Sequence, residues 1–355
     1  MKAIRLLDLG TVPAVRSQTC YHAVAHAMTE ATPDTIILVS PAEPYVCVGY
    51  HQDPGQEVDL DYCRERGLPV FRREVGGGAV YLDRGQVFVQ WIFRPSSLPA
   101  DVAERFRVYV ETLVRTYRAI GIEAEYRPVN DIHVRGRKIG GTGAAGIGRA
   151  EVVVGSFMFD FDKATMARVL RVSSEKMRDK VFQSLQDYMT TIGDELAAPP
   201  SRERVAAIYV EECARALGAG LVPGEWTEAE EAKARELDAL FVTPEWLGEK
   251  GAARRPGVKI HEDVHVHEAA FKAPGGLVRV TARLRAGRID DVSFSGDFTV
   301  LPREAVAEVE AALRGAPAEA GAVLEAARAV YGARAVQSPG LTPDDWAAAF
   351  AQLFR

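Results

Sequence analysis

The chain has 355 residues, more than one domain usually holds, so we expect two domains and a large buried core. Hydrophobic residues make up 47% and charged residues 26%, values that are typical of a globular protein and exclude a disordered or fibrous chain. Because 43 Lys and Arg stand against 49 Asp and Glu, the net charge is -6, and the chain lacks the overall basic field that binds nucleic acid.

The sequence contains no apolar run of about 18 residues that would span a membrane. Asp8 and Pro13 interrupt the N-terminal segment before the apolar core of a signal peptide forms, so we expect a cytoplasmic protein. The cysteines show neither a CxxC pair nor a metal-ligand spacing, and we expect reduced, structural thiols. They are Cys20, Cys47, Cys63 and Cys213.

Strands and helices alternate in the first third of the chain. Runs of β-branched and aromatic residues predict strands at 35–40, 45–50, 68–73, 79–83 and 87–93. A helix is predicted from about Asp101 to Ala119, because apolar residues recur there at steps of three and four. Gly121 stands where a C-terminal helix cap belongs.

In the middle of the chain, strands are predicted at 131–139 and 150–162, on either side of a flexible glycine-rich segment, "GGTGAAGIG" (140–148). These glycines match the GxGxxG pattern, but a strand rather than a helix follows them, which argues against a dinucleotide-binding fold. Helices are predicted at 163–172, after Asp162 as N-cap, and at 202–217, after Ser201.

A Gly-, Pro- and Arg-rich run, "GEKGAARRPG" (248–257), marks the expected boundary between a domain at 1–250 and a second at 258–355. The second domain is predicted as a small α+β unit. Its antiparallel strands are expected at 259–271, 276–287 and 289–296, and helices follow, the last of which begins at Thr342 with Pro343 in its first turn.

Two segments combine glycine with fixed charge. Arg72 and Arg73 precede Gly76–Gly78, and "NDIHVRGRK" (130–138) precedes the second glycine run. Backbone N–H groups beside guanidinium and ammonium groups form a cradle for phosphate and carboxylate oxygens. Each segment taken alone is also explained by a tight hairpin turn at Gly76–Gly78 and by a solvated basic face. The two together favour an anion site.

"RREVGGGAVYLDRG" (72–85) resembles the lipoyl-binding loop of the lipoate–protein ligase A family, and "VNDIHVRGRKIGGTGAA" (129–145) resembles the family segment that carries a catalytic lysine. Further segments are similar to the family at 46–63, 180–189, 243–250 and 289–298, so the likeness spans nearly the whole chain. It implies an α/β (α+β) fold: a class II synthetase-like large catalytic domain with a mixed, mainly antiparallel sheet, plus a small α+β C-terminal domain.

The resemblance implies that lipoate (or octanoate) and ATP form lipoyl-AMP with Mg2+, and that the acyl group then passes to a lysine of a lipoyl carrier domain. Lys138 is the implied catalytic residue, because a cation between the carboxylate and the α-phosphate offsets their repulsion. The residues implied to bind the nucleotide are Arg73, Gly78, Ala79, Val80, Tyr81, Asn130 and Asp131, with Asp131 also the Mg2+ ligand. Those implied to bind the acyl substrate are Arg72, Gly76, Gly77, Lys138, Gly140 and Thr142.

Three positions depart from the family pattern. Val154 stands where the family has His before Gly155, Gln86 stands where Asn is common, and the helix at 17–28 lacks an acidic residue. Two alternatives therefore stay open: an ATP-independent octanoyl or lipoyl transferase of the same fold, which needs a cysteine nucleophile, and a non-catalytic protein that binds lipoate or lipoyl domains. The absence of cysteine between Tyr126 and Val154 counts against the transferase. We also expect a monomer whose small domain moves when the adenylate forms.

Overall fold

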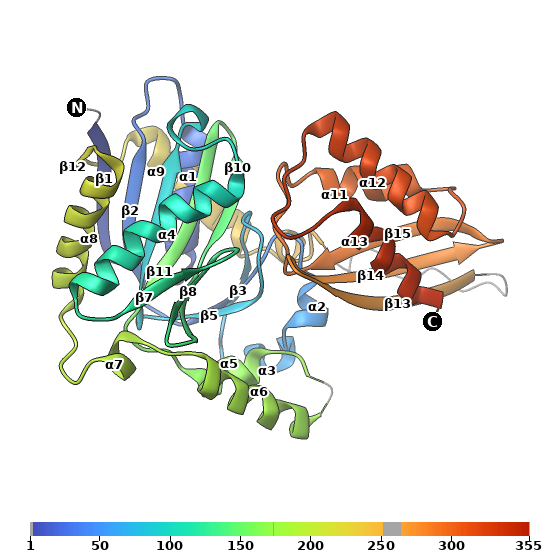
Figure 1. The fold of residues 1–355 in the computed structure, drawn as a ribbon, viewed down its shortest axis with the longest axis horizontal. Helices are drawn as coiled ribbons and strands as arrows, with labels where there is room; N and C mark the ends of the chain where they lie inside the picture. The colour runs from blue at the N-terminus through green and yellow to red at the C-terminus, as the bar shows by residue number, and fades with distance from the viewer. Residues whose placement is uncertain (1–2, 173, 251–263, 355) are drawn as a thin grey trace.

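The computed structural model describes residues 3–172, 174–250 and 264–354 (Figure 1). We call the described residues up to 250 the large unit and residues 264–354 the small unit. The expected boundary segment (248–257) lies outside the described residues from position 251 onward, as does the beginning of the strand expected at 259–271.

A six-stranded mixed sheet forms the centre of the large unit. Its strands are β1 (Ala3–Val12), β2 (Thr35–Pro41), β6 (Gln86–Phe93), β10 (Gly143–Ile147), β11 (Ala150–Met158) and β12 (Gly220–Pro223). They lie in the order β10-β11-β6-β2-β1-β12, parallel between β2, β1 and β12 and antiparallel between the others. The expectation of a mixed, mainly antiparallel sheet is confirmed.

Helices cover both faces of this sheet (Figure 1). They are α1 (Ala14–Ala27) and α9 (Glu228–Phe241) on one face, and α4 (Val102–Ala119) and α8 (Arg202–Leu217) on the other. Every residue of β2 is therefore buried: Ile36 and Leu38 belong to the core beneath α4, whereas Ile37 and Val39 belong to the core beneath α1. The predicted helices at 101–119 and 202–217 are confirmed, with Asp101 and Ser201 as their N-caps.

Two smaller sheets contain the two segments that combine glycine with fixed charge. One has the order β4-β3-β5, from β3 (Tyr45–Val48), β4 (Val70–Arg72) and β5 (Val80–Leu82). Because β4 and β5 both pair with β3 and not with each other, the interpretation of Gly76–Gly78 as a tight hairpin turn is wrong. The other sheet is antiparallel and consists of β7 (Ala124–Arg127), β8 (Asp131–Val134) and β9 (Arg137–Gly141).

The segment at 131–148 differs from its prediction. The single strand expected at 131–139 is the β8–β9 hairpin, which turns at Arg135 and Gly136, both with positive φ. The segment at 140–148, expected to be flexible, instead completes β9 and forms β10, which pairs with β11. A Cβ on Gly143 would lie 2.6 Å from Val75 Cγ1, so glycine serves close packing here rather than flexibility. The first strand, β1, was not predicted.

Shorter helices complete the large unit. They are α2 (Pro54–Glu57), α3 (Leu60–Glu65), α5 (Lys163–Val169), α6 (Glu175–Tyr188), α7 (Ile192–Glu195) and α10 (Pro244–Leu247). Helices α3, α5 and α6 lie together at the lower edge of the view in Figure 1. The predicted N-cap of α5 is confirmed, since the Asp162 carboxylate accepts from Thr165 N–H. Among the described residues, no helix has the length and apolar composition needed to cross a membrane.

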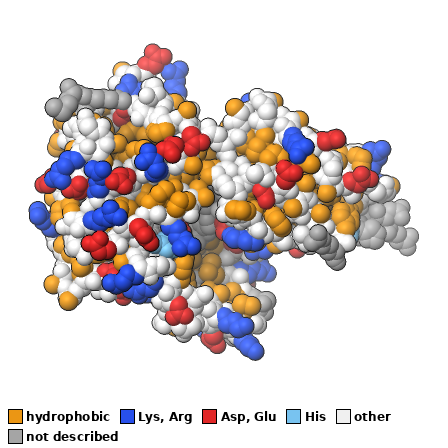
Figure 2. All heavy atoms as spheres, viewed as in Figure 1, with side chains coloured by type: hydrophobic (Ala, Val, Ile, Leu, Met, Phe, Trp, Pro, Cys, Tyr) orange, Lys and Arg blue, Asp and Glu red, His pale blue; other side chains and the backbone are white. Residues whose placement is uncertain are grey.

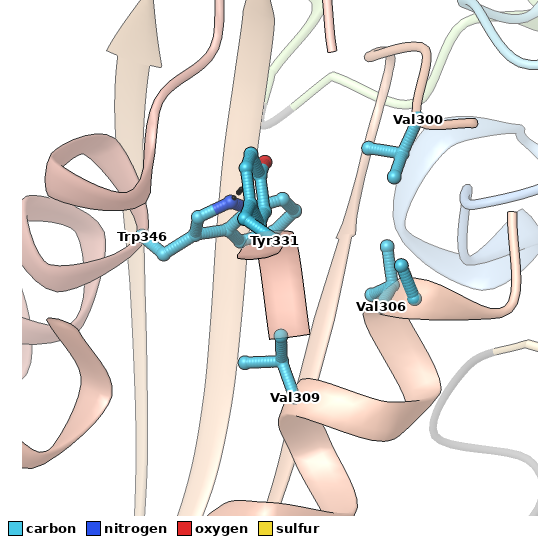
Figure 3. A pocket seen from close by; sticks show the side chains of 6 residues that line it. Val300, Val306, Val309, Tyr331 and Trp346 are labelled. Carbon is cyan, nitrogen blue, oxygen red and sulfur yellow. Dashed lines mark hydrogen bonds between the residues drawn. The ribbon is translucent and has the colours of Figure 1, made fainter. Parts of the chain in front are cut away.

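The small unit is a three-stranded antiparallel sheet packed against helices, as predicted. Its elements are β13 (Val264–Ala273), β14 (Gly276–Arg285), β15 (Arg288–Gly296), α11 (Ala305–Leu313), α12 (Ala320–Arg334) and α13 (Pro343–Ala351). Its core has a small apolar gap between Val300, Val306, Val309 and Trp346, whose indole N–H donates to Tyr331 Oη at 2.8 Å (Figure 3). The gap has no room for a water molecule, so it belongs to core packing.

Arg72 connects distant parts of the large unit through hydrogen bonds. Its guanidinium is fully buried and donates to the carbonyls of Gly49, Tyr50 and Gln52 at 2.7–3.1 Å. On the other side it donates to carbonyls in the segment 246–250, at 2.7–3.3 Å. Burial lowers the pKa of Arg72 to about 10, so the group remains charged at neutral pH. Arg72 thus has a structural role in the large unit, whereas its expected contact with an acyl substrate stays a prediction.

Replacing Arg72 by Lys should lower the free energy of unfolding by at least about 2 kcal/mol, because three ammonium donors cannot satisfy the carbonyls that the guanidinium fork reaches. Urea unfolding followed by circular dichroism measures the change. Arg84→Lys is the matched control, since Arg84 is exposed and donates to one carbonyl, that of Ala42. Equal unfolding midpoints for wild type and Arg72→Lys would contradict this role.

Candidate functional site

A cavity of about 690 Å³ lies between the large unit and the small unit. This is the size of cavities that hold small organic ligands, about 300–1,000 Å³. Its walls come from the loop at 76–82, β6, the β8–β9 hairpin, β11, α6 and the turn that follows β13. Figure 2 shows Lys and Arg interspersed with Asp and Glu over the face of the molecule in view.

The structure brings most of the predicted site residues to this one cavity, although they come from separate sheets. Those that line it are Arg73, Gly76, Gly77, Gly78, Ala79, Val80, Tyr81, Asn130, Asp131, Lys138 and Thr142. Arg72 and Gly140 do not line it. Gly140 instead lies in β9, where a Cβ would lie 3.5 Å from Ile132 Cδ1.

Lys138 and Asp131 form an ion pair across the β8–β9 hairpin. Lys138 Nζ lies 2.7 Å from Asp131 Oδ1, and both side chains are about three-quarters buried, with 28% and 23% exposed. Gly141 faces Asp131 in the register, and a Cβ there would lie 3.0 Å from Lys138 Nζ. The missing side chain therefore leaves room for the ammonium group to fold back toward the carboxylate.

Asn130 and Thr142 hold the open end of the same hairpin together. The Thr142 N–H and hydroxyl both donate to Asn130 O at 2.9 Å, and Asn130 Nδ2 donates to Thr142 O at 2.5 Å. Asn130 therefore has a positioning role, because its amide nitrogen already donates to the backbone carbonyl of Thr142.

The glycine-rich loop, residues 76–78, is held by Arg73 from one side. The Arg73 guanidinium donates to Gly76 O at 2.8 Å, to Gly78 O at 2.9 Å and to Cys47 O at 3.3 Å. Gly77 has φ +93°, a conformation that favours glycine. The carbonyls of Gly76 and Gly78 accept from Arg73, and the three glycines line the cavity with backbone atoms alone.

Apolar side chains from several elements form part of the cavity wall. The hydrophobic residues that line it include Tyr21, Phe88, Phe106, Val154, Met158, Met166 and Met189. Val154 pairs with Gln90 of β6 and with Gly143 of β10, so the position where the family has His adds to the apolar wall. Such a surface suits an aliphatic chain better than a charged group.

None of the cysteines lines the cavity, and all four are buried. Burial raises the pKa of Cys20 to about 12, that of Cys63 to about 11 and that of Cys213 to about 12. The pKa of Cys47 is also raised by burial. These thiols therefore stay protonated at neutral pH, whereas a nucleophilic cysteine reacts as the thiolate. The expectation of structural thiols agrees with this environment.

Asp131 is the residue that was expected to bind Mg2+. Among the described residues there is no group of three or more His, Cys, Asp or Glu that could hold a metal ion. A single carboxylate still fits Mg2+, which binds one or two carboxylates and takes its other ligands from phosphates and water. The donor set thus suits a metal that arrives with a nucleotide.

Sequence reasoning missed two neighbours of this ion pair. His133 is fully buried, its Nδ1 bonds Gly136 O at 3.2 Å, and its Nε2 lies 3.8 Å from Asp131 Oδ2. Because Nδ1 donates to that carbonyl, Nε2 accepts from the Tyr188 hydroxyl, at 3.3 Å. The sequence carried no signal for this contact, since it depends on where α6 packs against the hairpin.

The small unit contacts the glycine-rich loop directly. Gly77 N–H donates to Phe298 O at 3.3 Å, and Gly296 N–H donates to His51 O at 3.1 Å.

Arg303 forms an ion pair with the buried Glu74. Burial opposes the ionisation of Glu74, but the hydrogen bond from His26 and the charges of His22 and Arg303 outweigh it and lower the pKa of Glu74 to about 2.

Comparison with known proteins identifies the family of this chain. Residues 18–214 match the family model for the lipoyl protein ligase A/B catalytic domain. The octanoyltransferase LipM of Kyrpidia tusciae is 32% identical over 274 residues, which cover 69% of this chain and 98% of that protein.

Two solved structures resemble about 70% of this chain. The first belongs to a bi-partite lipoate protein ligase from Thermoplasma acidophilum, studied with its E2 lipoyl domain; the TM-score is 0.64 at 28% identity, over 70% of this chain and 97% of that chain. The second is a lipoate-protein ligase A bound with ATP; the TM-score is 0.60 at 25% identity, over 70% of this chain and 98% of that chain. The class II synthetase-like fold expected of the large domain is confirmed. The chain belongs to the lipoyl protein ligase A/B family and is an enzyme of the group that contains lipoate–protein ligases and octanoyltransferases.

Proposed function

We propose that the protein is an ATP-dependent lipoate–protein ligase, which converts lipoate or octanoate to an acyl-adenylate and transfers the acyl group to a lysine of a lipoyl carrier domain. The observation that carries the proposal is the composition of the cavity, which offers fixed cations and bare glycine backbone but no cysteine. An ATP-bound relative and a relative studied with a lipoyl domain support the same choice of substrates.

In the first step, the lipoate carboxylate attacks the α-phosphorus of ATP, and pyrophosphate leaves. Two anions must approach each other, so a fixed cation between them lowers the barrier. We assign this role to Lys138. Its pairing with Asp131 at 2.7 Å holds the ammonium at the cavity wall before substrate arrives.

The nucleotide is proposed to lie along Gly78, Ala79, Val80 and Tyr81, where backbone N–H groups meet phosphate oxygens. Arg73 keeps the loop in place through its carbonyl contacts, rather than by reaching toward the phosphates. Asp131 would hold Mg2+, with Asn130 beside it, and the metal would neutralise phosphate charge.

The acyl chain is proposed to lie against the apolar wall, with Gly76, Gly77 and Thr142 near its carboxyl end. Val154 in place of the family histidine extends this apolar surface. The wall suits the octanoyl chain and the lipoyl chain alike, so both are proposed substrates.

An octanoyltransferase remains the second candidate, because LipM of Kyrpidia tusciae is among the similar proteins. That reaction passes the acyl group through a cysteine thioester. The Cys20 thiol donates to Gln90 Oε1, on a residue that lines the cavity, at 3.0 Å, and burial raises the pKa of Cys20 to about 12. Its protonated, buried state disfavours this candidate.

We also propose that residues 1–250 form the catalytic domain and 258–355 an accessory domain that shifts once the adenylate forms, in a monomeric protein. The two units have separate hydrophobic cores. The polar contacts that join them include Arg279 with Glu57 at 2.7 Å and Val102 N–H with Gln337 Oε1 at 2.8 Å. Identical X-ray scattering profiles with and without bound adenylate would count against the shift.

The acyl transfer should require ATP. Incubation with lipoate, MgATP and a lipoyl domain should add one lipoyl group to the domain, as measured by its intact mass. Omission of ATP should abolish the modification, because no activated acyl group is then available. Octanoyl transfer from an octanoylated carrier protein in the absence of ATP would support the transferase instead.

Lys138→Ala should lower lipoate-dependent ATP–pyrophosphate exchange by roughly 100-fold or more, the usual effect of removing a group that stabilises transition-state charge. Lys233→Ala is the matched control, since Lys233 lies on α9 outside the cavity. Both variants should unfold at the wild-type urea concentration. An exchange rate for Lys138→Ala within about threefold of wild type would refute this assignment.

A further inference from the structure

The small unit supplies one wall of the cavity through the turn that follows β13. Pro274, Gly275 and Gly276 line the cavity together with Lys272. Gly275 N–H donates to Gly340 O at 2.6 Å, so the turn is held by the loop before α13. Lys272 is the last residue but one of β13, and its side chain is exposed.

Three cationic side chains line the cavity in the described part of the chain, and two of them are already engaged. Arg73 donates to three backbone carbonyls, and Lys138 is paired with Asp131. The ammonium group of Lys272 has no hydrogen bond or ion pair to any described residue. Lys272 is therefore the cation that is available to a ligand.

Lys272 and the glycine-rich loop line the same cavity. Lys272 faces Leu277 across the β13–β14 pair, and Leu277 N–H donates to the Asp297 carboxylate. Asp297 in turn lies against Gly78, with 3.5 Å between Asp297 Cβ and the position of a Cβ on Gly78. Asp297 also lines the cavity, and its carboxylate accepts a hydrogen bond from Leu277 N–H at the start of β14.

We propose that Lys272 is a substrate-contacting residue, a cation that the small unit contributes to the phosphates of ATP in the first half-reaction. The inference rests on the proposed ATP-dependent function and adds to it a residue outside the large unit. When the carboxylate oxygen bonds to the α-phosphorus, the bond from that phosphorus to the bridging oxygen breaks, and pyrophosphate takes the electron pair. Lys272 offsets the charge on the departing phosphates.

The adenylate retains a single phosphate, so Lys272 should matter little after pyrophosphate has left. The proposal thus separates the two half-reactions: loss of Lys272 weakens ATP use but spares transfer of the acyl group from the adenylate to the carrier. A general defect in folding or in the contact between the units would instead affect both steps.

The test uses the full chain with Lys272→Ala and Lys272→Arg. Arg285→Ala is the control, since Arg285 is exposed at the other end of β14. ATP–pyrophosphate exchange gives KM for MgATP, and a single-turnover reaction with preformed lipoyl-adenylate gives the transfer rate. Lys272→Ala should raise KM for MgATP about tenfold, the effect of one charge-assisted contact. Lys272→Arg should stay within about threefold of wild type, because Arg keeps the charge.

Transfer from preformed adenylate should stay within about twofold of wild type in all three variants. An unchanged KM for MgATP in Lys272→Ala would overturn the proposal, and so would an equal loss in both half-reactions. Calorimetric titration with MgATP distinguishes failure of the Lys272 proposal from failure of the proposed ATP-dependent function. If the wild type binds MgATP without catalysing exchange, the ligase activity is contradicted, and weaker binding by Lys272→Ala still supports the contact. If the wild type does not bind MgATP, both are contradicted.

Discussion

The cavity depends on the close approach of backbone around the glycine-rich loop. A Cβ on Gly49 would lie 1.9 Å from Gly77 O, one on Gly76 would lie 2.7 Å from Phe298 O, and one on Gly143 would lie 2.6 Å from Val75 Cγ1. The loop therefore contacts Gly49, which follows β3, and the small unit where no side chain fits between them, and Val75 just before the loop contacts β10 in the same way. Arg72 and Arg73 add hydrogen bonds to carbonyls on both sides, so the loop is fixed by its surroundings although its residues are intrinsically free.

This loop brings bare backbone to the same cavity as the Lys138–Asp131 pair, which a second small sheet holds in place. The cavity thus combines polar groups, suited to phosphate and carboxylate, with apolar side chains, suited to an acyl chain. The four thiols are buried and do not line the cavity, and burial keeps them protonated at neutral pH. Charge, shape and thiol burial thus all favour activation of the acyl group by a nucleotide over activation by a cysteine.

Much of this architecture could be predicted from the sequence because it depends on local patterns. The period of α4 and the caps at Asp101, Asp162 and Ser201 depend on neighbouring residues alone. The structure also brings to the cavity most of the residues that the resemblance to the family named. The errors concern tertiary partners: nothing local shows that β4 and β5 both pair with β3. Nothing local shows either that the Arg72 guanidinium donates to carbonyls in the segment 246–250. Lys272 could not be found at all, since it meets the cavity only through the packing of the two units.

The central claim is that the acyl group is activated as an adenylate and not as a thioester. The most direct measurement is the mass of the protein after incubation with lipoate and MgATP in the absence of any acceptor, under native conditions and again after acid denaturation. The account predicts a native species that carries lipoyl-AMP and a denatured chain of unmodified mass. A denatured chain that retains a lipoyl group, released by hydroxylamine as a thioester would be, would contradict it.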